Sequence, residues 1–184
     1  MNSKNLNDIA IAFILIALAI TTRLIPHPWS FTCVGSVLLF SVFYFKDRRF
    51  VQVLMPLAIM LISDLFLLYF HNKPFSGIGI YLCWLAYLPI SSILIKKIQI
   101  KNIALAGFSG ATLFFIASNF LVWVNTGGFP YTYDITGLIN CYTAGIPFYL
   151  NSVAGNLVWS SIIFGVYELS TYSVKDLSLN NRNY

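Results

Sequence analysis

Charged residues are scarce in this chain. Only 9% of its 184 residues are Asp, Glu, Lys or Arg, whereas 58% are hydrophobic. A soluble domain normally carries about a quarter charged residues, and this chain has too few to cover a surface that faces water on every side. The composition therefore excludes an ordinary soluble domain and favours a membrane protein, and the length favours one domain.

Residues suited to metal, disulfide or nucleotide chemistry are also few. The chain has two histidines and three cysteines, and it contains no HxxxH, HExxH, CxxC or GxxxxGK[ST] motif. We therefore expect no metal site, no cofactor and no disulfide framework, and any ATP-driven step would need a partner ATPase. The net charge is +5, but no basic patch is interleaved with aromatic residues, so a nucleic-acid partner is not expected.

Long apolar stretches dominate the sequence instead. A helix that crosses a membrane needs about 20 mostly apolar residues. Six stretches meet or approach this length: residues 9–25, 31–45, 50–70, 78–95, 103–124 and 147–167. They predict an all-α membrane protein in which residues 1–170 form a compact six-helix transmembrane bundle. Residues 171–184 are predicted to be a cytoplasmic tail, of which residues 175–184 are expected to be disordered.

Lysine and arginine are distributed unevenly between the two sides of such a bundle. With both termini in the cytoplasm, nine of the 11 basic residues fall on the cytoplasmic side, and only Arg23 and Lys73 fall on the outer side. Cytoplasmic loops of membrane proteins carry an excess of Lys and Arg. The pattern therefore predicts a multi-pass protein with both termini cytoplasmic.

The longest predicted outer loop, residues 125–147, joins the fifth and sixth stretches. It contains several glycines and three tyrosines but no Lys or Arg. Loops of this length are usually functional or disordered. The apolar segment 135–146 within it is too short to cross a membrane, so we expect it to form a re-entrant or interfacial segment.

Polar side chains gather in the outer half of the predicted bundle. With a rise of about 1.5 Å per residue, Asp64 lies about 21 Å along its helix and Asn119 about 24 Å along its own. Asn151 and Asn156 follow the outer end of the last stretch, and Arg23 ends the first stretch at the same level. We therefore predict a single polar layer on the outer side.

Two interpretations of this layer remain open. A carboxylate in hydrocarbon costs several kcal/mol unless it is paired or faces water, so we expect Asp64 to pair with Arg23. The two residues form either a structural ion pair between helices or the floor of a binding cavity open to the outside. The asparagines similarly either bond helix to helix or contact a ligand.

The outer loops add histidine and aromatic candidates. His27 lies between two prolines and is expected either to brace its loop or to hold a polar group of a ligand. Trp29, Trp123 and Tyr142 belong to an aromatic set at the outer level, which is typical of a membrane interface. Aromatic rings also stack on planar ligands, so these three residues remain candidates for binding.

Four ordered motifs give the chain a resemblance to known proteins: RLIPHPWSFTCVGSVLLFSVFYFKDRRF, PLAIMLISDLFL, FFIASNFLVW and GLINCYTAGIPF. They lie within residues 20–165 and resemble an uncharacterised family of bacterial transport proteins. That family in turn resembles the substrate-binding components of energy-coupling-factor vitamin transporters. The resemblance implies six helices in the bacterial inner membrane, with a vitamin-like micronutrient bound near the outer face by the first, third and fifth loops.

The resemblance also implies which residues contact the ligand. They are Arg23 and His27 in the first motif, Asp64 in the second, Asn119 and Trp123 in the third, and Asn140, Cys141 and Tyr142 in the fourth. A transmembrane coupling subunit and ATPases are implied as partners. The alanines of the first helix, however, recur at seven residues rather than at the four usual for the docking helix of such components, so independent operation stays open.

The sequence therefore leads to the hypothesis of a membrane component that binds a small molecule in an outward-facing cavity. Flat aromatic vitamins, corrinoids and small cations would all suit it. Two alternatives stay open. One is an integral membrane enzyme that acts on a lipid-like substrate with Asp64 and His27 as an acid–base pair. The other is a structural or assembly factor whose polar layer docks another membrane protein.

Overall fold

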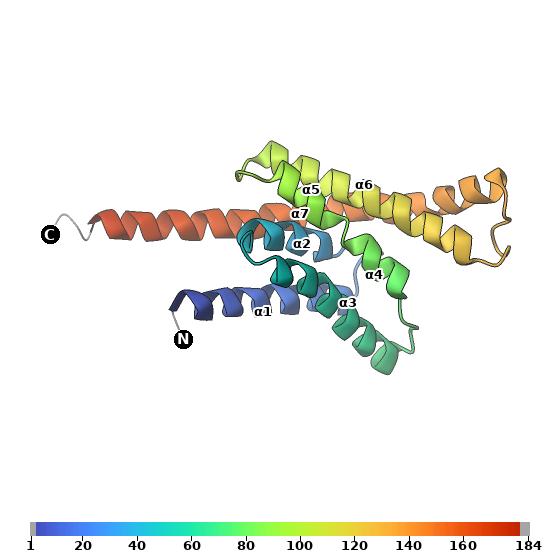
Figure 1. Cartoon of the computed structure of the whole chain (residues 1–184), viewed down its shortest axis with the longest axis horizontal. Coiled ribbons are helices and arrows are strands. Elements are labelled where there is room, and N and C mark those ends of the chain that lie inside the picture. Colours follow the sequence, from blue (N-terminus) through green and yellow to red (C-terminus); the bar gives the residue numbers. More distant parts are fainter. Residues whose placement is uncertain (1–2, 181–184) are drawn as a thin grey trace.

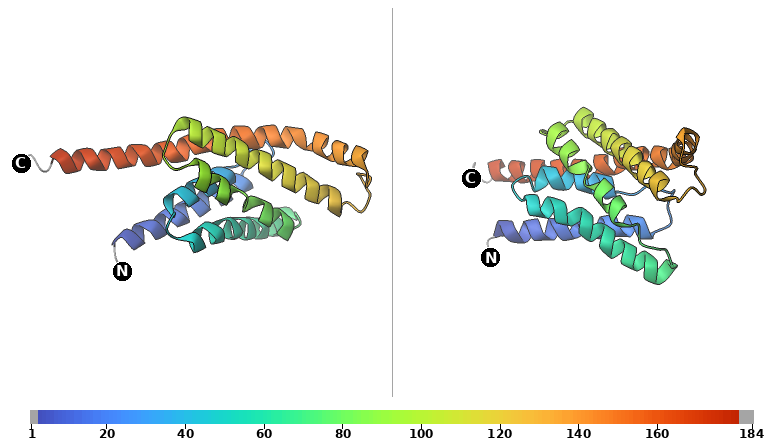
Figure 2. Two further views of the ribbon diagram at one scale, coloured as in Figure 1. Left: turned by 45° about the horizontal axis from the view of Figure 1, so that its top comes forward. Right: turned by 45° about the vertical axis from the view of Figure 1, so that its right-hand side comes forward.

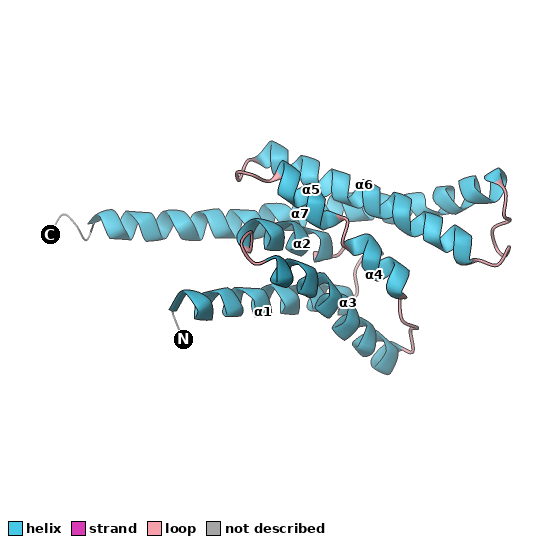
Figure 3. Ribbon diagram, viewed as in Figure 1, coloured by secondary structure: helices cyan, strands magenta, loops and turns pink. Residues whose placement is uncertain are grey.

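The computed structural model describes the backbone of residues 3–180 and the side chains of residues 6–172. Within these residues the fold is helical and has no strand, so the predicted all-α class is confirmed (Figure 1 and Figure 3). The helices are α1 (Ser3–Leu24), α2 (Val34–Tyr44), α3 (Arg49–His71), α4 (Ile78–Trp84), α5 (Tyr87–Leu94), α6 (Ile100–Asn125) and α7 (Ile135–Asn180).

The second helix is the core of the bundle. All residues from Val34 to Val42 are buried, and α2 packs against α1, α3, α5, α6 and α7. A helix that is apolar on every side is expected to be buried in this way. With its 11 residues, α2 rises only about 16 Å, which is about half the hydrocarbon thickness of a bilayer. The helix is therefore shorter than the predicted stretch of residues 31–45.

The prediction of one continuous helix over residues 78–95 is wrong. Helix α4 ends at Trp84, α5 begins at Tyr87, and residues 85–86 form a turn between them. Pro89 provides the physical reason. It has no N–H to donate to the carbonyl four residues earlier, and its ring would clash with that carbonyl in a continuous helix.

The last helix is longer than predicted at both ends. It begins at Ile135, and its backbone remains helical to Asn180. The predicted loop over residues 125–147 is therefore confined to residues 126–134, and the apolar segment 135–146 is helical. The prediction of disorder in the tail is wrong for the described backbone, and residues 181–184 lie outside it. Pro147 does not start this helix but lies inside it. Helices in membranes tolerate proline where neighbouring groups satisfy the freed carbonyl.

Asp134 determines where α7 begins. Its Oδ1 accepts hydrogen bonds from the backbone N–H of Gly137 and from the hydroxyl of Thr132, each at 2.7 Å. A side chain that satisfies a free N–H of the first helical turn is a helix N-cap. The Gly137 N–H, followed by the Thr132 hydroxyl, holds the pKa of Asp134 below its usual range, because both donors favour the ionised carboxylate.

Three helices are long and apolar enough to cross a membrane. They are residues Leu6–Leu24 of α1, the whole of α3 and the whole of α6. Large apolar side chains on these helices are exposed, such as Phe13 at 69% and Phe50 at 74%. Soluble monomers rarely expose apolar surface on this scale, so these faces are suited to lipid. The length and apolar surface of these three helices therefore indicate a membrane protein.

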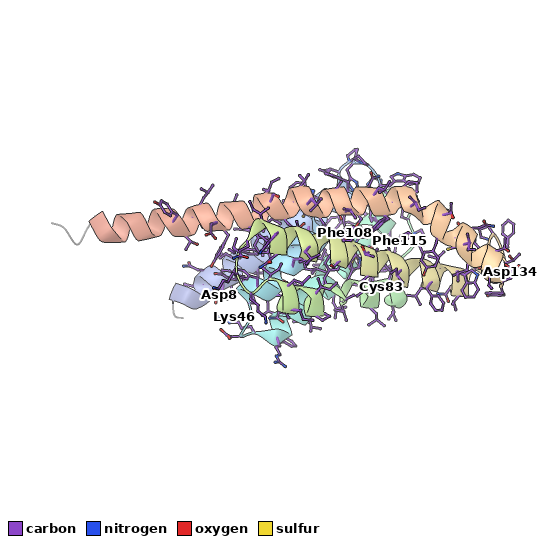
Figure 4. The ribbon with its side chains drawn as sticks, turned by 90° about the horizontal axis from the view of Figure 1, so that it is seen from above. Asp8, Lys46, Cys83, Phe108, Phe115 and Asp134 are labelled. Carbon is purple, nitrogen blue, oxygen red and sulfur yellow. The ribbon has the colours of Figure 1, made fainter. Side chains whose placement is uncertain are left out.

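The two ends of the bundle differ. Helix α1 begins and α7 ends toward one end, whereas the connections from α3 to α4 and from α6 to α7 lie toward the other (Figure 1 and Figure 2). Figure 4 shows Asp8 and Lys46 toward the first end and Asp134 at the second. We refer to them as the Asp8 end and the Asp134 end.

Candidate ligand-binding cavity

Arg23 and Asp64 form the predicted ion pair. Arg23, in the last turn of α1, places Nη2 2.9 Å from Oδ1 of Asp64 in α3. Its Nη1 donates to the Ser63 hydroxyl and lies 3.2 Å from the sulfur of Met60. The Asp64 side chain is 1% exposed and that of Arg23 is 15% exposed. The pair therefore joins α1 to α3 at a position largely shielded from solvent.

Asp64 is also held by donors that follow α3 in the chain. Its Oδ2 accepts hydrogen bonds from the Ser76 backbone N–H and the Tyr81 hydroxyl, each at 2.8 Å. The Ser76 hydroxyl donates to Oδ1 at 3.2 Å. A buried carboxylate is tolerated only when it is paired and hydrogen-bonded, and both oxygens of Asp64 meet this condition. Asp64 therefore connects α1, α3 and α4.

A cavity of about 540 Å³ lies beside this pair. Helices α1, α3, α4, α6 and α7 contribute to its walls. His27, Lys73 and Tyr131 line it from the α1–α2, α3–α4 and α6–α7 connections, which are the three segments that the resemblance implies for ligand contact. Small-molecule sites commonly enclose about 300–1,000 Å³, so the cavity has a suitable size.

Aromatic rings form much of the cavity wall. They belong to Trp84, Phe114, Phe115, Tyr131, Phe148 and Tyr149. Several of these rings pack on one another, with centroids 4.3 Å apart for Trp84 and Phe114 and 4.9 Å apart for Phe115 and Tyr149. Figure 4 labels Phe115 between the middle of the bundle and the Asp134 end. Such rings offer flat apolar surface on which a planar ligand can stack.

The charged side chains in the wall, those of Arg23 and Lys73, are both basic. Arg23, His27 and Lys73 line the cavity, and among the described residues no Asp or Glu does so. Asp64 stands behind Arg23 and offsets its charge. The ammonium group of Lys73 therefore gives the cavity a positive potential, which favours a neutral or anionic ligand over a cation.

Four of the predicted site residues line the cavity, namely Arg23, His27, Asn119 and Cys141. The Nδ1 atom of His27 lies 2.6 Å from the carbonyl oxygen of Pro28, so the ring also braces its own loop. Asn119 donates one N–H to the carbonyl of Phe115 at 2.8 Å. The side-chain NH₂ group of Asn119 is thus already hydrogen-bonded within α6.

Three further predicted residues fix the connections outside the cavity. Trp29 stacks on Phe148 with ring centroids 5.3 Å apart, and Asn151 donates to the Trp29 carbonyl at 3.0 Å. The indole N–H of Trp123 donates to the Thr132 carbonyl at 2.9 Å. These contacts attach the α1–α2 connection to α7, and the α6–α7 connection to α6.

The remaining predicted residues also lie outside the cavity wall. Tyr142 donates its hydroxyl to the backbone carbonyl of Ile116 at 2.7 Å, and Asn140 is exposed. Asn156 is buried and donates to the Tyr87 hydroxyl at 2.9 Å and to a backbone carbonyl of α6 at 3.0 Å. The interpretation of the asparagines as links between helices is therefore confirmed for Asn156.

Sequence reasoning did not single out Lys73 or most of the cavity-lining rings. The residues of α6 that line the cavity nevertheless follow one helical face, with spacings of three, four and seven: Ala111, Phe114, Phe115, Ser118, Asn119 and Val122. Residues at these spacings share a side of a helix. A search for polar and aromatic residues on the face of Asn119 could therefore have found this wall.

The two members of the acid–base pair considered above have different hydrogen-bond partners. His27 lines the cavity, whereas Asp64 lies outside its wall and accepts hydrogen bonds from Arg23, Ser76 and Tyr81. In the part of the chain that the structure describes, no three His, Cys, Asp or Glu side chains converge as metal ligands would. The cavity is suited to binding through stacking, hydrogen bonds and charge.

The long apolar helices indicate a helical membrane protein. The shielded ion pair and the cavity beside it form its candidate binding site. A family model described as a family of unknown function, DUF6580, matches residues 3–177. The chain belongs to this family. No curated protein and no solved structure matches it.

Proposed function

We propose that this protein is the membrane substrate-binding component of a micronutrient uptake transporter, and that the cavity beside Arg23 holds the ligand. The observation that supports this most strongly is the cavity of about 540 Å³ itself, which combines aromatic walls with Arg23, Lys73 and Asn119. Ligand sites typically combine an apolar lining with a few placed polar groups.

We further propose that the chain crosses a bacterial inner membrane six times, with both ends in the cytoplasm. In this arrangement the second crossing combines the short helix α2 with the non-helical connection before it, α4 and α5 cross together as a broken helix, and α7 is the sixth crossing. Non-helical backbone at membrane depth is tolerated where it is buried in protein or lines a cavity. Trp84, next to the break, lines this cavity. The excess of Lys and Arg assigned to the cytoplasmic side supports the orientation.

The ligand class follows from the lining. The rings favour a flat, partly apolar molecule, and the basic groups favour one that is neutral or carries a carboxylate or phosphate. A small cation is disfavoured, because no carboxylate among the described residues lines the cavity. Since the sequence contains no nucleotide-binding motif, ATP-driven uptake would depend on partner ATPases and a coupling subunit.

Native mass spectrometry of the gently purified full chain tests the proposal. The wild type is expected to retain a small molecule after growth in rich medium. Ala144→Phe is expected to lose it, because Ala144 lines the cavity and the added ring would occupy the space. Ala154→Phe is the matched control, because Ala154 is exposed on the same helix and does not line the cavity.

A wild type that never copurifies with a small molecule would contradict the proposal. So would equal retention by both variants, because the ligand would then lie elsewhere. If the purified protein instead converts the retained molecule without any partner, the membrane-enzyme hypothesis replaces the transport one.

A further inference from the structure

A second cavity, of about 850 Å³, lies toward the Asp8 end of the bundle. Its walls come from α1, α2, α3, α5, α7 and the connections from α2 to α3 and from α5 to α6. None of the predicted site residues lines it, and it shares no lining residue with the cavity beside Arg23. Figure 4 labels Asp8 and Lys46, two of its lining residues, near each other.

The carboxylate of Asp8 is already satisfied within the protein. Asp8 is 8% exposed, and its Oδ2 lies 2.9 Å from Nη2 of Arg48. Its Oδ1 accepts a hydrogen bond from the Tyr44 hydroxyl at 3.1 Å. These contacts tie α1 to the α2–α3 connection, and they offset the charge of Asp8 at the cavity wall.

The uncharged polar groups in the wall are also engaged. Gln52 donates to the carbonyls of Phe45 at 2.9 Å and Val42 at 3.4 Å. The hydroxyls of Ser91 and Ser92 donate to backbone carbonyls at 2.7 and 2.9 Å. A serine hydroxyl has one hydrogen to donate, and a glutamine amide has two. Few neutral donors therefore remain for a ligand.

Apart from the hydroxyl of Tyr167, the side-chain donors that remain are cationic. Lys46, Arg49 and Lys96 line the cavity and form no ion pair among the described residues. One further carboxylate, that of Asp47, also lines it. Three cations against one carboxylate leave a surplus of positive charge, and the ligand that fits such a wall is an anion with several acceptor oxygens.

We propose that this second cavity binds a phosphate group, carried either by an anionic lipid headgroup of the cytoplasmic leaflet or by a free phosphate-bearing solute. Phosphate oxygens only accept hydrogen bonds in the dianion, which matches a wall in which three cationic donors outnumber the one further carboxylate, that of Asp47. Basic pockets between transmembrane helices on the cytoplasmic side are suited to lipid headgroups. The proposal does not depend on what the cavity beside Arg23 binds.

Titrations of the full chain in an uncharged detergent, followed by thermal unfolding, test this inference. The probes are dihexanoyl phosphatidylglycerol, dihexanoylglycerol without phosphate, and glycerol phosphate without acyl chains. The cavity variant is Lys46→Gln/Lys96→Gln. The matched control is Lys97→Gln/Lys101→Gln, which removes the same charge from exposed positions near the same end but outside the cavity wall.

Phosphatidylglycerol is expected to raise the unfolding temperature of the wild type, and dihexanoylglycerol is not. The cavity variant is expected to lose about tenfold more affinity for phosphatidylglycerol than the control, since each basic group near a headgroup contributes to binding. Stabilisation by glycerol phosphate to the same extent assigns the site to a free solute, and stabilisation by phosphatidylglycerol alone assigns it to lipid. Equal losses in the two variants, or equal effects of the lipids with and without phosphate, would overturn the inference.

Discussion

Asp64 is the residue on which the contacts near the cavity depend most. It binds the guanidinium of Arg23 in α1, the backbone of Ser76 and the hydroxyl of Tyr81 in α4. Arg23 itself lines the cavity. The carboxylate therefore acts on the cavity indirectly, by fixing the position of Arg23. Asp64 is a positioning residue, and its loss changes stability as well as binding.

We expect Asp64→Asn to lower the free energy of unfolding by about 3–5 kcal/mol, because Arg23 keeps its charge and loses its counter-charge. The combined variant Arg23→Met/Asp64→Asn is expected to recover part of this loss, since no unpaired charge remains. Unfolding in detergent, followed by circular dichroism, measures both values. A combined variant less stable than Asp64→Asn alone would show that the charge of Arg23 is not the source of the destabilisation.

At the scale of whole helices, close approach between α5, α6 and α7 depends on small residues of α6. Gly110 lies directly against the ring of Tyr87, and a Cβ atom there would overlap the ring. Gly107 accepts a hydrogen bond from Asn156 at its carbonyl, at 3.0 Å. Asn156 also binds the Tyr87 hydroxyl, so one amide links α5, α6 and α7.

Gly110→Ala is expected to destabilise the protein by about 1–3 kcal/mol, the usual cost of overpacking a filled core. Gly165→Ala in α7 is the control, because no atom lies within 4 Å of the position its Cβ would take, apart from the nearby backbone of its own helix and its chain neighbours. That control should be neutral or gain up to about 1 kcal/mol from helix propensity. Thermal unfolding of both variants under one condition makes the comparison. Equal stability of the two would contradict the tight contact between Gly110 and Tyr87.

Helix boundaries were predictable only in part. The three long apolar helices follow from length and hydrophobicity, and they agree with the expected stretches at residues 9–25, 50–70 and 103–124 within a few residues. The break between α4 and α5 was signalled by Pro89, but an apolar stretch alone does not reveal it. The predicted start at Pro147 is wrong, because proline is tolerated inside a membrane helix and the side chain of Asp134 caps α7 before Ile135.

At the scale of the whole molecule, two cavities lie toward opposite ends of one bundle. The cavity beside Arg23 is lined from connections toward the Asp134 end, and the basic cavity from the α2–α3 connection toward the Asp8 end. The buried helix α2 packs between the surrounding helices. Under the proposed orientation, the first cavity takes solute from outside and the second faces the cytoplasmic leaflet.

The positions of the site residues along their helices could be predicted from the sequence. Which of these residues line the cavity could not. Position along a helix follows from the rise per residue, so Arg23, Asp64 and Asn119 could be assigned to one layer from sequence alone. Which way a side chain faces depends on how each helix is rotated against its neighbours. For this reason Asn119 lines the cavity, while Asn156 bonds between helices and Asp64 lies behind Arg23.

The most direct test of the account is the side from which each cavity can be reached. In a chain without its native cysteines, Ser152→Cys places a thiol in the cavity beside Arg23, and Ser92→Cys places one in the basic cavity. A membrane-impermeant thiol reagent added to intact cells is expected to label Ser152→Cys, and to label Ser92→Cys only after the cells are opened. Labelling of Ser92→Cys in intact cells, with Ser152→Cys protected until the cells are opened, would contradict an outward-facing binding cavity.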